Sequence, residues 1–306
     1  MKTLEALKGT IRSVEDLQSV VKTMKALAAV SIRQYEQAVE SLVDYNRTVE
    51  MGLQIVMRQR YFAGNFAFPS SMAVATKLKS DRHLGVIIFG SDQGLCGQFN
   101  EQIVAYATSQ LDELQGSVEN EAIAVVGARP IPLLEGRGYP IAQQFSVPHA
   151  AVGITQQVQE ILLTIQQWQA QQDITWIILF YNQPQAGTSY RSRSLQLLPM
   201  DADWLHRLEH QPWPTQVLPT FTMDESQLLS ALVRQYLFIS LYRAFAASLA
   251  SENASRLSSM QMAEKNIEER LSDLNAEYRR QRQSSITEEL LDIVAGFEAL
   301  TQPFRR

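Results

Sequence analysis

The residues that break helices are confined to the middle of this chain. Ten of its eleven prolines lie between Pro69 and Pro219, and eleven of its fourteen glycines lie between Gly64 and Gly187. Because proline and glycine interrupt helices, only the two ends of the chain can form long ones. The sequence therefore predicts two long terminal helices that flank a segment of different structure.

The two ends carry apolar residues at helical spacing. Over residues 3 to 58, and again over residues 225 to 300, apolar side chains recur in steps of three and four. At 1.5 Å per residue these helices would be roughly 80 and 110 Å long, which is more than a compact domain can cover. The simplest partner for each helix is the other, so we expect an antiparallel two-helix coiled coil.

Between the ends, strand patterns alternate with helix patterns. Segment 83–91, HLGVIIFGS, is a short apolar run rich in β-branched residues, and a glycine-rich turn and an amphipathic stretch follow it. We therefore expect the α/β fold class, with a Rossmann-like domain inserted between the helices of a long antiparallel two-helix coiled coil. The expected strands are 83–91, 122–128, 174–182 and an edge strand at 189–198, and the expected helices are 101–114, 132–136 and 154–171.

These patterns divide the chain into five parts. We expect an N-terminal coiled-coil helix at 1–60, a linker at 61–82, the inserted α/β domain at 83–200, a foot and linker at 201–224, and a C-terminal coiled-coil helix with an apolar tip at 225–306.

Charge and composition exclude several partners. The chain has 27 basic and 32 acidic residues and a net charge of −5, which argues against a mainly electrostatic contact with nucleic acid. No run of 18 apolar residues is present, so we expect neither a membrane span nor export. The single cysteine permits no internal disulfide, and it excludes a switch that depends on two thiols.

The glycine-rich turn at 90–100 lies where α/β proteins place phosphates. Its glycines are spaced G-x3-G-x2-G, which matches neither the dinucleotide fingerprint nor a P-loop, and no lysine follows. We therefore predict no cofactor bound by this chain. Cys96 has no histidine near it in sequence and is expected to be a packed thiol, and Ser91 and Asp92 are expected to cap the next helix.

His206 and His210 are four residues apart, with Glu209 between them. This spacing can hold a metal on a helix face, but two ligands do not make a site, so we predict no metal. Neither G-x-S-x-G nor H-E-x-x-H is present. The sequence shows no catalytic constellation, and we expect a protein that is not itself an enzyme.

The end of the last helix is apolar on most of its sides. A lone rod in water would not tolerate such a surface, so the tip predicts a sleeve of partner protein. Its apolar residues are Leu290, Leu291, Ile293, Val294, Ala295, Phe297, Ala299 and Leu300.

Four segments together resemble the gamma subunit of F-type rotary ATP synthases. They are 11–34, 91–100 (SDQGLCGQFN), 248–257 (SLASENASRL) and 282–296 (RQSSITEELLDIVAG), and the resemblance covers nearly the whole chain. It implies a central rotor shaft that couples ion-driven rotation of the c-ring to the catalytic beta subunits. The implied partners are the alpha and beta subunits, the epsilon subunit and the c-ring, on the cytoplasmic or equivalent face of an energy-transducing membrane.

The resemblance also implies two sets of functional residues, none of them catalytic. The coupling contacts with the alpha and beta subunits would be Met24, Lys25, Glu252, Arg256, Arg282, Gln283, Thr287 and Glu289. The bearing tip would be Leu290, Ile293, Val294, Phe297 and Leu300.

The chain departs from the family at a few positions. Gln93 replaces a usual basic residue, Gln98 replaces a small one, and segment 219–225 lacks the Tyr and Glu common near the ring contact. Residues 1–37 look more like the gamma-like subunits of alternative ATPases, some of them sodium-translocating. Two other classes stay open: a free-standing coiled-coil scaffold, and a nucleotide-binding α/β enzyme with helical arms.

Overall fold

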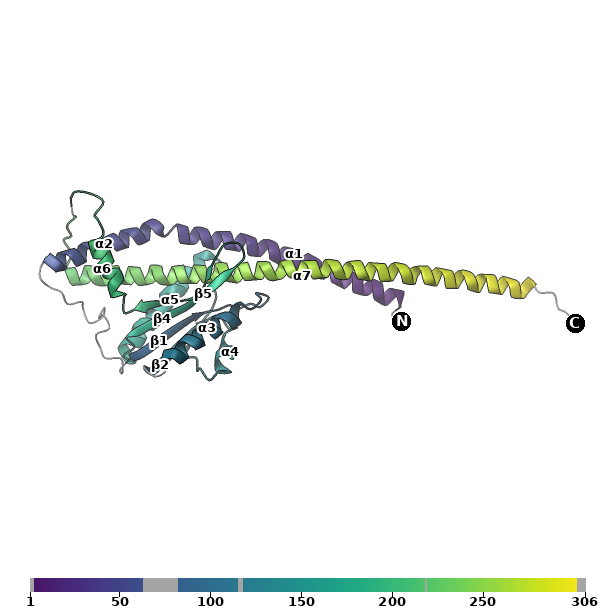
Figure 1. Cartoon of the computed structure of the whole chain (residues 1–306), viewed down its shortest axis with the longest axis horizontal. Coiled ribbons are helices and arrows are strands. Elements are labelled where there is room, and N and C mark those ends of the chain that lie inside the picture. Colours follow the sequence, from purple (N-terminus) through teal and green to yellow (C-terminus); the bar gives the residue numbers. More distant parts are fainter. Residues whose placement is uncertain (1–2, 63–81, 115–117, 218, 302–306) are drawn as a thin grey trace. The chain divides into compact units, whose positions relative to one another are not determined.

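The computed structural model describes residues 3–62, 82–114, 118–217 and 219–301 (Figure 1). The chain forms two compact units, one of residues 1–27 with 258–306 and one of residues 28–257. Two long helices, α1 (Leu4–Glu40) and α7 (Glu225–Thr301), contribute residues to both units. The linker predicted at 61–82 lies almost entirely outside the described residues, and the predicted domain limits stay a prediction.

The terminal helices pair in antiparallel fashion, as the sequence predicts. In the first unit Lys25 of α1 forms an ion pair with Glu264 of α7. In the second unit Tyr45 Oη, on α2 (Val43–Phe62), donates to Gln235 Oε1 at 2.7 Å. In the same unit Gly52 lies against Leu232, so a later residue of the N-terminal segment meets an earlier residue of α7, which defines the antiparallel direction.

The N-terminal helix is interrupted where the sequence shows no glycine or proline. A turn at Ser41 and Leu42 separates α1 from α2. There Ser41 Oγ donates to the carbonyl of Ala38 at 2.8 Å, and Leu42 N donates to Val39, three residues back instead of four. Serine hydroxyls compete with the helix for backbone partners, so the expected single helix becomes two.

The second unit contains a five-stranded sheet of order β3-β2-β1-β4-β5. The first four strands in that order are parallel and β5 runs antiparallel to β4 at the edge, so the α/β fold class is confirmed. The strands are β1 (Arg82–Phe89), β2 (Val118–Val126), β3 (Gln143–Phe145), β4 (Trp176–Pro184) and β5 (Tyr190–Leu198). The helices among and after them are α3 (Phe99–Leu114), α4 (Ile131–Glu135), α5 (Ile154–Gln171) and α6 (Ala202–His210).

Alternate residues of β1 face two separate cores. Val86 and Ile88 belong to the cluster that includes α3, whereas Ile87 and Phe89 belong to the cluster that includes α5 and α7. The rings of Phe89 and Phe245 meet edge to face with their centroids 5.2 Å apart. One face of the sheet is therefore packed directly on α7, so the helix forms part of the domain's core.

In the part of the chain that the structure describes, no helix combines the length and the apolar character needed to cross a bilayer.

Candidate functional site

The predicted coupling residues are divided between the two units. Glu252 and Arg256 belong to the second unit, and the other coupling residues and the bearing tip belong to the first. Within the first unit Lys25 is engaged by Glu264, and Met24 beside it is half-buried. The charge of Lys25 therefore stabilises the helix pair itself.

The predicted coupling residues at the end of α7 are exposed. Arg282, Gln283, Thr287 and Glu289 all lie on the surface. The hydroxyl of Thr287 donates to the carbonyl of Gln283 at 2.9 Å, so its own helix already satisfies this donor. Arg282 and Glu289 are seven residues apart on α7, about two helical turns, and both side chains are exposed to a partner protein.

The bearing tip exposes large apolar side chains. Leu290, Ile293, Val294 and Phe297 are all more than half exposed, and Phe297 reaches 68%. The side chain of Leu300 lies outside the described residues. Soluble monomers rarely expose contiguous apolar surface of this kind, and such patches mark protein contacts.

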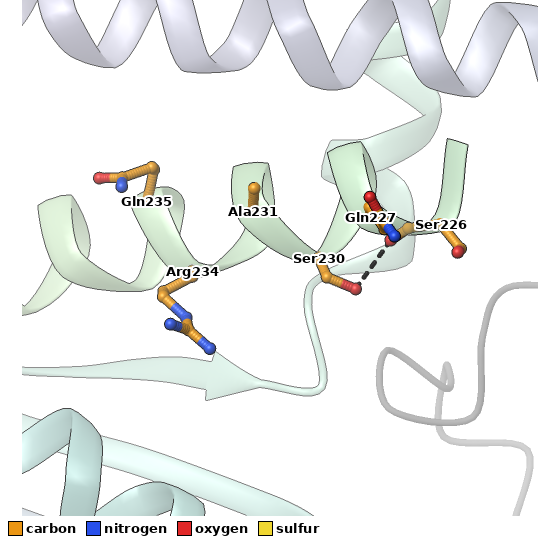
Figure 2. A pocket seen from close by; sticks show the side chains of 6 residues that line it. All are labelled: Ser226, Gln227, Ser230, Ala231, Arg234 and Gln235. Atoms are coloured by element: carbon orange, nitrogen blue, oxygen red, sulfur yellow. Dashed lines mark hydrogen bonds between the residues drawn. The ribbon is translucent and has the colours of Figure 1, made fainter. Parts of the chain in front are cut away.

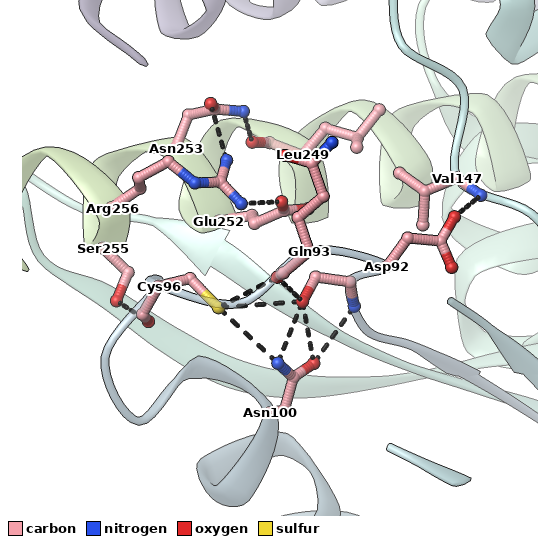
Figure 3. A network of polar contacts seen from close by, with 11 residues as sticks. Asp92, Gln93, Cys96, Asn100, Val147, Leu249, Glu252, Asn253, Ser255 and Arg256 are labelled. Carbon is pink, nitrogen blue, oxygen red and sulfur yellow. Dashed lines mark hydrogen bonds and ion pairs between the residues drawn. The ribbon is translucent and has the colours of Figure 1, made fainter. Parts of the chain in front are cut away.

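Glu252 and Arg256 form a buried ion pair. Only 5% of Glu252 and 9% of Arg256 are exposed, and Arg256 Nη2 donates to Glu252 Oε1 at 2.6 Å (Figure 3). Arg256 Nη1 also donates to Asn253 Oδ1 at 3.1 Å. Burial raises the pKa of the Glu252 carboxyl, and the guanidinium beside it opposes that rise. Their proposed contact with alpha or beta subunits stays a prediction.

The buried pair belongs to a larger set of contacts that fastens the α/β domain to α7. Ser255 Oγ donates to the carbonyl of Cys96 at 2.5 Å (Figure 3). Ser251 Oγ donates to the carbonyl of Asn182 on β4 at 3.0 Å. We call these contacts the polar junction: Ser251, Glu252, Asn253, Ser255 and Arg256 of α7 with Asn182 and the turn at 91–100. Two of its hydrogen bonds, from Ser251 and Ser255, join the helix to the domain.

The turn at 91–100 is held in shape by its own side chains. Asn100 Oδ1 accepts from Ser91 N at 3.0 Å, and Asn100 Nδ2 donates to Ser91 Oγ at 2.9 Å. Asp92 accepts from the backbone N–H groups of Ala128 and Val147 at 2.9 and 2.8 Å. The expectation that Ser91 and Asp92 cap α3 is therefore wrong: Asp92 joins this turn to two other loops.

A glycine allows the close approach on which this turn depends. Gly127 has a φ of +89°, and a Cβ there would lie 2.6 Å from the backbone carbon of Ser91. Cys96 is 2% exposed, as the sequence predicts, and burial raises the pKa of its thiol. The thiol is therefore shielded by protein, whereas Leu95 in the same turn is 61% exposed.

Sequence reasoning missed most of the polar junction. It singled out Glu252 and Arg256 but passed over Ser251, Asn253 and Ser255. The available signal was a cluster of small polar residues in SLASENASRL, on a stretch of helix with few large charged side chains. Small polar residues at positions that a helix buries indicate close contact with another backbone.

Two further features have groups that could bind a ligand. A cavity of about 530 Å³ lies along the first turns of α7, lined by Ser226, Gln227, Ser230, Ala231, Arg234 and Gln235 (Figure 2). It is open and holds hydroxyls, amides and one guanidinium, so no reactive group faces it. On α6, Glu209 joins His206 and His210 as a third donor, which sequence reasoning did not count.

Known proteins match the chain over its whole length. A family model described as ATP synthase matches residues 3–300. The ATP synthase gamma chain of Nostoc punctiforme is 27% identical over 331 positions, which cover 98% of this chain and all of that one. The corresponding chain of Rhizobium rhizogenes is 28% identical, again with 98% and 100% coverage.

A solved structure shows the same fold. It comes from the Euglena gracilis mitochondrial ATP synthase, in the assembly of OSCP, F1 and c-ring in rotational state 3, with a TM-score of 0.60. The match covers 99% of this chain and 97% of that one at 17% identity. With the family model spanning residues 3–300, these findings show that the chain belongs to the ATP synthase family.

Proposed function

We propose that this chain is the central rotor shaft of a membrane-bound rotary ATP synthase, a non-catalytic subunit that couples rotation of the c-ring to catalysis. The observation that carries the proposal is the end of α7, an exposed apolar helix that needs a surrounding partner. The match to ATP synthase gamma chains over 98% of the chain agrees with it. The scaffold and the nucleotide-binding enzyme have no comparable support.

A shaft acts through differential contacts. An asymmetric helix pair inside a ring of alternating alpha and beta subunits presents a different face to each beta subunit at each angle. Each catalytic site therefore changes its conformational balance as the shaft turns, because a contact shifts an equilibrium only when it differs between the two states. Arg282 and Glu289, both charged and exposed, are the side chains we expect to make such contacts.

The polar junction helps to transfer torque between the α/β domain and α7. Torque that enters through the α/β domain must pass into α7 without the two sliding past each other. Buried, directional contacts such as Ser255 to Cys96 and Ser251 to Asn182 resist sliding, whereas apolar packing alone tolerates repacking. The sheet and this stretch of α7 therefore turn as one body.

The partners follow from the shaft role. The apolar tip and the charged residues before it meet the alpha and beta subunits of the catalytic head, and the α/β domain with its foot meets the epsilon subunit and the c-ring. The chain works in association with an energy-transducing membrane, on its cytoplasmic or equivalent face.

The test is recovery of the complex through this chain. An affinity tag inserted at Gly187, an exposed turn glycine with a φ of +74° and open space around it, is used to purify the protein from gently solubilised membranes. Alpha, beta and c-ring subunits in one peak with ATPase activity support the shaft. A single folded, elongated chain in the soluble fraction refutes it. A matched tagged chain that ends at residue 289 should lose most of the associated ATPase activity.

A further inference from the structure

Three potential metal ligands converge on one face of α6. His206, Glu209 and His210 each offer a ligand atom, and these atoms all lie within 4.8 Å of one another. In a tetrahedral zinc site, bond lengths of roughly 2.0 to 2.2 Å place ligand atoms about 3.4 Å apart. Both histidines are exposed, so rotation of their side chains can shorten the separations, by at most about 1.4 Å, to that distance.

The opposite face of α6 fixes the direction of these side chains. Leu205 and Leu208 are buried in the core, and the ring of Trp204 lies 4.8 Å from that of Tyr236 on α7. Arg58 Nε of α2 donates to the carbonyl of Glu209 at 2.9 Å. These contacts hold one side of α6 against the domain, so the helix presents its donors on a packed support, which lowers the entropy lost on binding.

A hydrogen bond determines which nitrogen of His210 is available. Its Nδ1 lies 2.8 Å from the carbonyl oxygen of His206. A carbonyl oxygen can only accept, so Nδ1 carries the proton and Nε2 keeps its lone pair for a metal. Binding therefore needs no change of tautomer at this residue.

The charges beside the donors are one carboxylate and two arginines that are engaged elsewhere, of which Arg58 binds the backbone carbonyls of Glu209 and Gln211. Glu209 brings a carboxylate whose Oε2 lies 3.7 Å from Nδ1 of His206. Arg207, the nearest cationic side chain in sequence, is drawn toward Asp201, with 3.7 Å between Nη2 and Oδ2. Its charge is thereby partly neutralised.

We propose that His206, Glu209 and His210 bind one zinc(II) ion, with water in the remaining position. Two imidazoles and one carboxylate suit zinc and its neighbours nickel and copper, whereas calcium and magnesium prefer all-oxygen sites. The bound ion clamps the last turn of α6 and leaves one coordination position open. None of its ligands is a coupling residue or a tip residue, so its existence does not depend on the shaft role.

The test titrates zinc against a chromophoric chelator in the full chain, kept soluble in a mild, non-chelating detergent. The wild type should bind one equivalent. His206→Gln and His210→Gln should each weaken binding by roughly tenfold or more, and Glu209→Gln by less, because a neutral amide oxygen is a poorer ligand. His149→Gln, at an exposed histidine elsewhere, should bind as the wild type does.

Cobalt(II) adds a spectroscopic readout, since three protein ligands and one water should produce the visible absorption of a tetrahedral site. Far-UV circular dichroism checks that each variant is folded. The proposal is overturned if the wild type does not bind zinc at micromolar concentrations. It is equally overturned if the folded double variant His206→Gln/His210→Gln binds zinc with unchanged affinity.

Discussion

Residues 251–256 and residues 290–297 belong to the same helix. They depart in opposite ways from the rule that folded proteins bury apolar side chains and expose polar ones. The first stretch buries a serine pair, an asparagine and an ion pair, and the second exposes leucine, isoleucine, valine and phenylalanine. In the first, partners for the polar groups come from the chain itself: from α7, from the turn at 91–100 and from β4. In the second, the mismatch calls for another protein. The first stretch therefore makes contacts that hold the chain together, and the second is left for contacts with partner subunits.

The largest effect on folding should come from breaking the buried ion pair. Arg256→Ala leaves the Glu252 carboxylate without its charge partner inside the second unit, which should lower the free energy of unfolding by about 3–5 kcal/mol. Urea unfolding of the full chain measures the loss. Labelling of Cys96, the single cysteine, should also become faster, because the turn that shields it is released.

A matched double variant separates pairing from packing. Glu252→Leu with Arg256→Met removes both charges and keeps most of the volume, so it should lose much less stability than Arg256→Ala. Glu269→Ala, at an exposed site on the same helix, should change the free energy of unfolding by less than about 0.5 kcal/mol. Equal losses in the single and double variants would contradict an essential role for pairing.

Polar substitution of the tip should reduce ATPase activity and leave the stability of the chain nearly unchanged. Ile293→Asp is expected to leave unfolding nearly unchanged, because Ile293 is 68% exposed, and to reduce ATPase activity of the assembled complex by roughly tenfold. Activity per purified complex and urea unfolding of the full chain are measured side by side. A destabilised chain that forms a fully active complex would reverse the contrast between the two regions.

Removing the charges before the tip should have a smaller effect. Arg282→Ala and Glu289→Ala should each reduce ATPase turnover several-fold while the complex still assembles, since such contacts tune coupling and do not create the fit. Glu135→Ala, on exposed α4, is the matched control and should retain full turnover. Unchanged turnover in both variants would remove these residues from the coupling role.

The smallest effect concerns the start of α7. Asp224 Oδ1 accepts from the backbone N–H groups of Ser226 and Gln227 at 3.0 and 3.1 Å, and the hydrogen bond from the Ser226 hydroxyl is the main cause of its lowered pKa. A lowered folded-state pKa means that this stabilisation is present above the unfolded value of about 4 and is lost as pH falls through the folded value.

Asp224→Ala should therefore lower the thermal midpoint slightly at pH 7, and the gap to the wild type should close in acid. Melting curves across the pH range measure this gap. Asp203→Ala, which removes another exposed carboxylate near the start of a helix, serves as the comparison. A gap that widens as pH falls would contradict the sign of the shift.

Much of the fold was predictable because its signals are local. The breaker-free end predicted a long helix from residue 225, where α7 begins, and the amphipathic stretch 154–171 coincides with α5. The turn at Ser41 was not predictable, because a serine in a helical stripe looks the same whether its hydroxyl faces water or bonds to the backbone. The burial of Glu252 and Arg256 was missed for a related reason: an ion pair one turn apart is usually exposed, and only contacts distant in sequence bury it here.

The parts of the candidate site also differ in whether the sequence could predict them. The exposed tip follows from composition alone, since an all-round apolar helix end has to be covered. The polar junction requires three-dimensional contacts between residues about 70 to 160 positions apart, such as Ser251 with Asn182 and Ser255 with Cys96. No periodicity in a single sequence reports such a pairing. Glu209 was visible in the sequence as a third potential metal ligand on α6, but its closeness to both histidines was not.

The turn at Ser41 and Leu42 also bears on how such a chain can change its length over evolution. An insertion at that turn adds a residue outside any helix, so the hydrogen-bonded ladders of α1 and α2 are undisturbed. An insertion in α7, which runs for 77 residues, would rotate every later side chain by about 100° around the helix axis. Arg282, Glu289 and the tip would then face the wrong neighbours. Length variation among relatives should therefore be tolerated at the turn and selected against in α7.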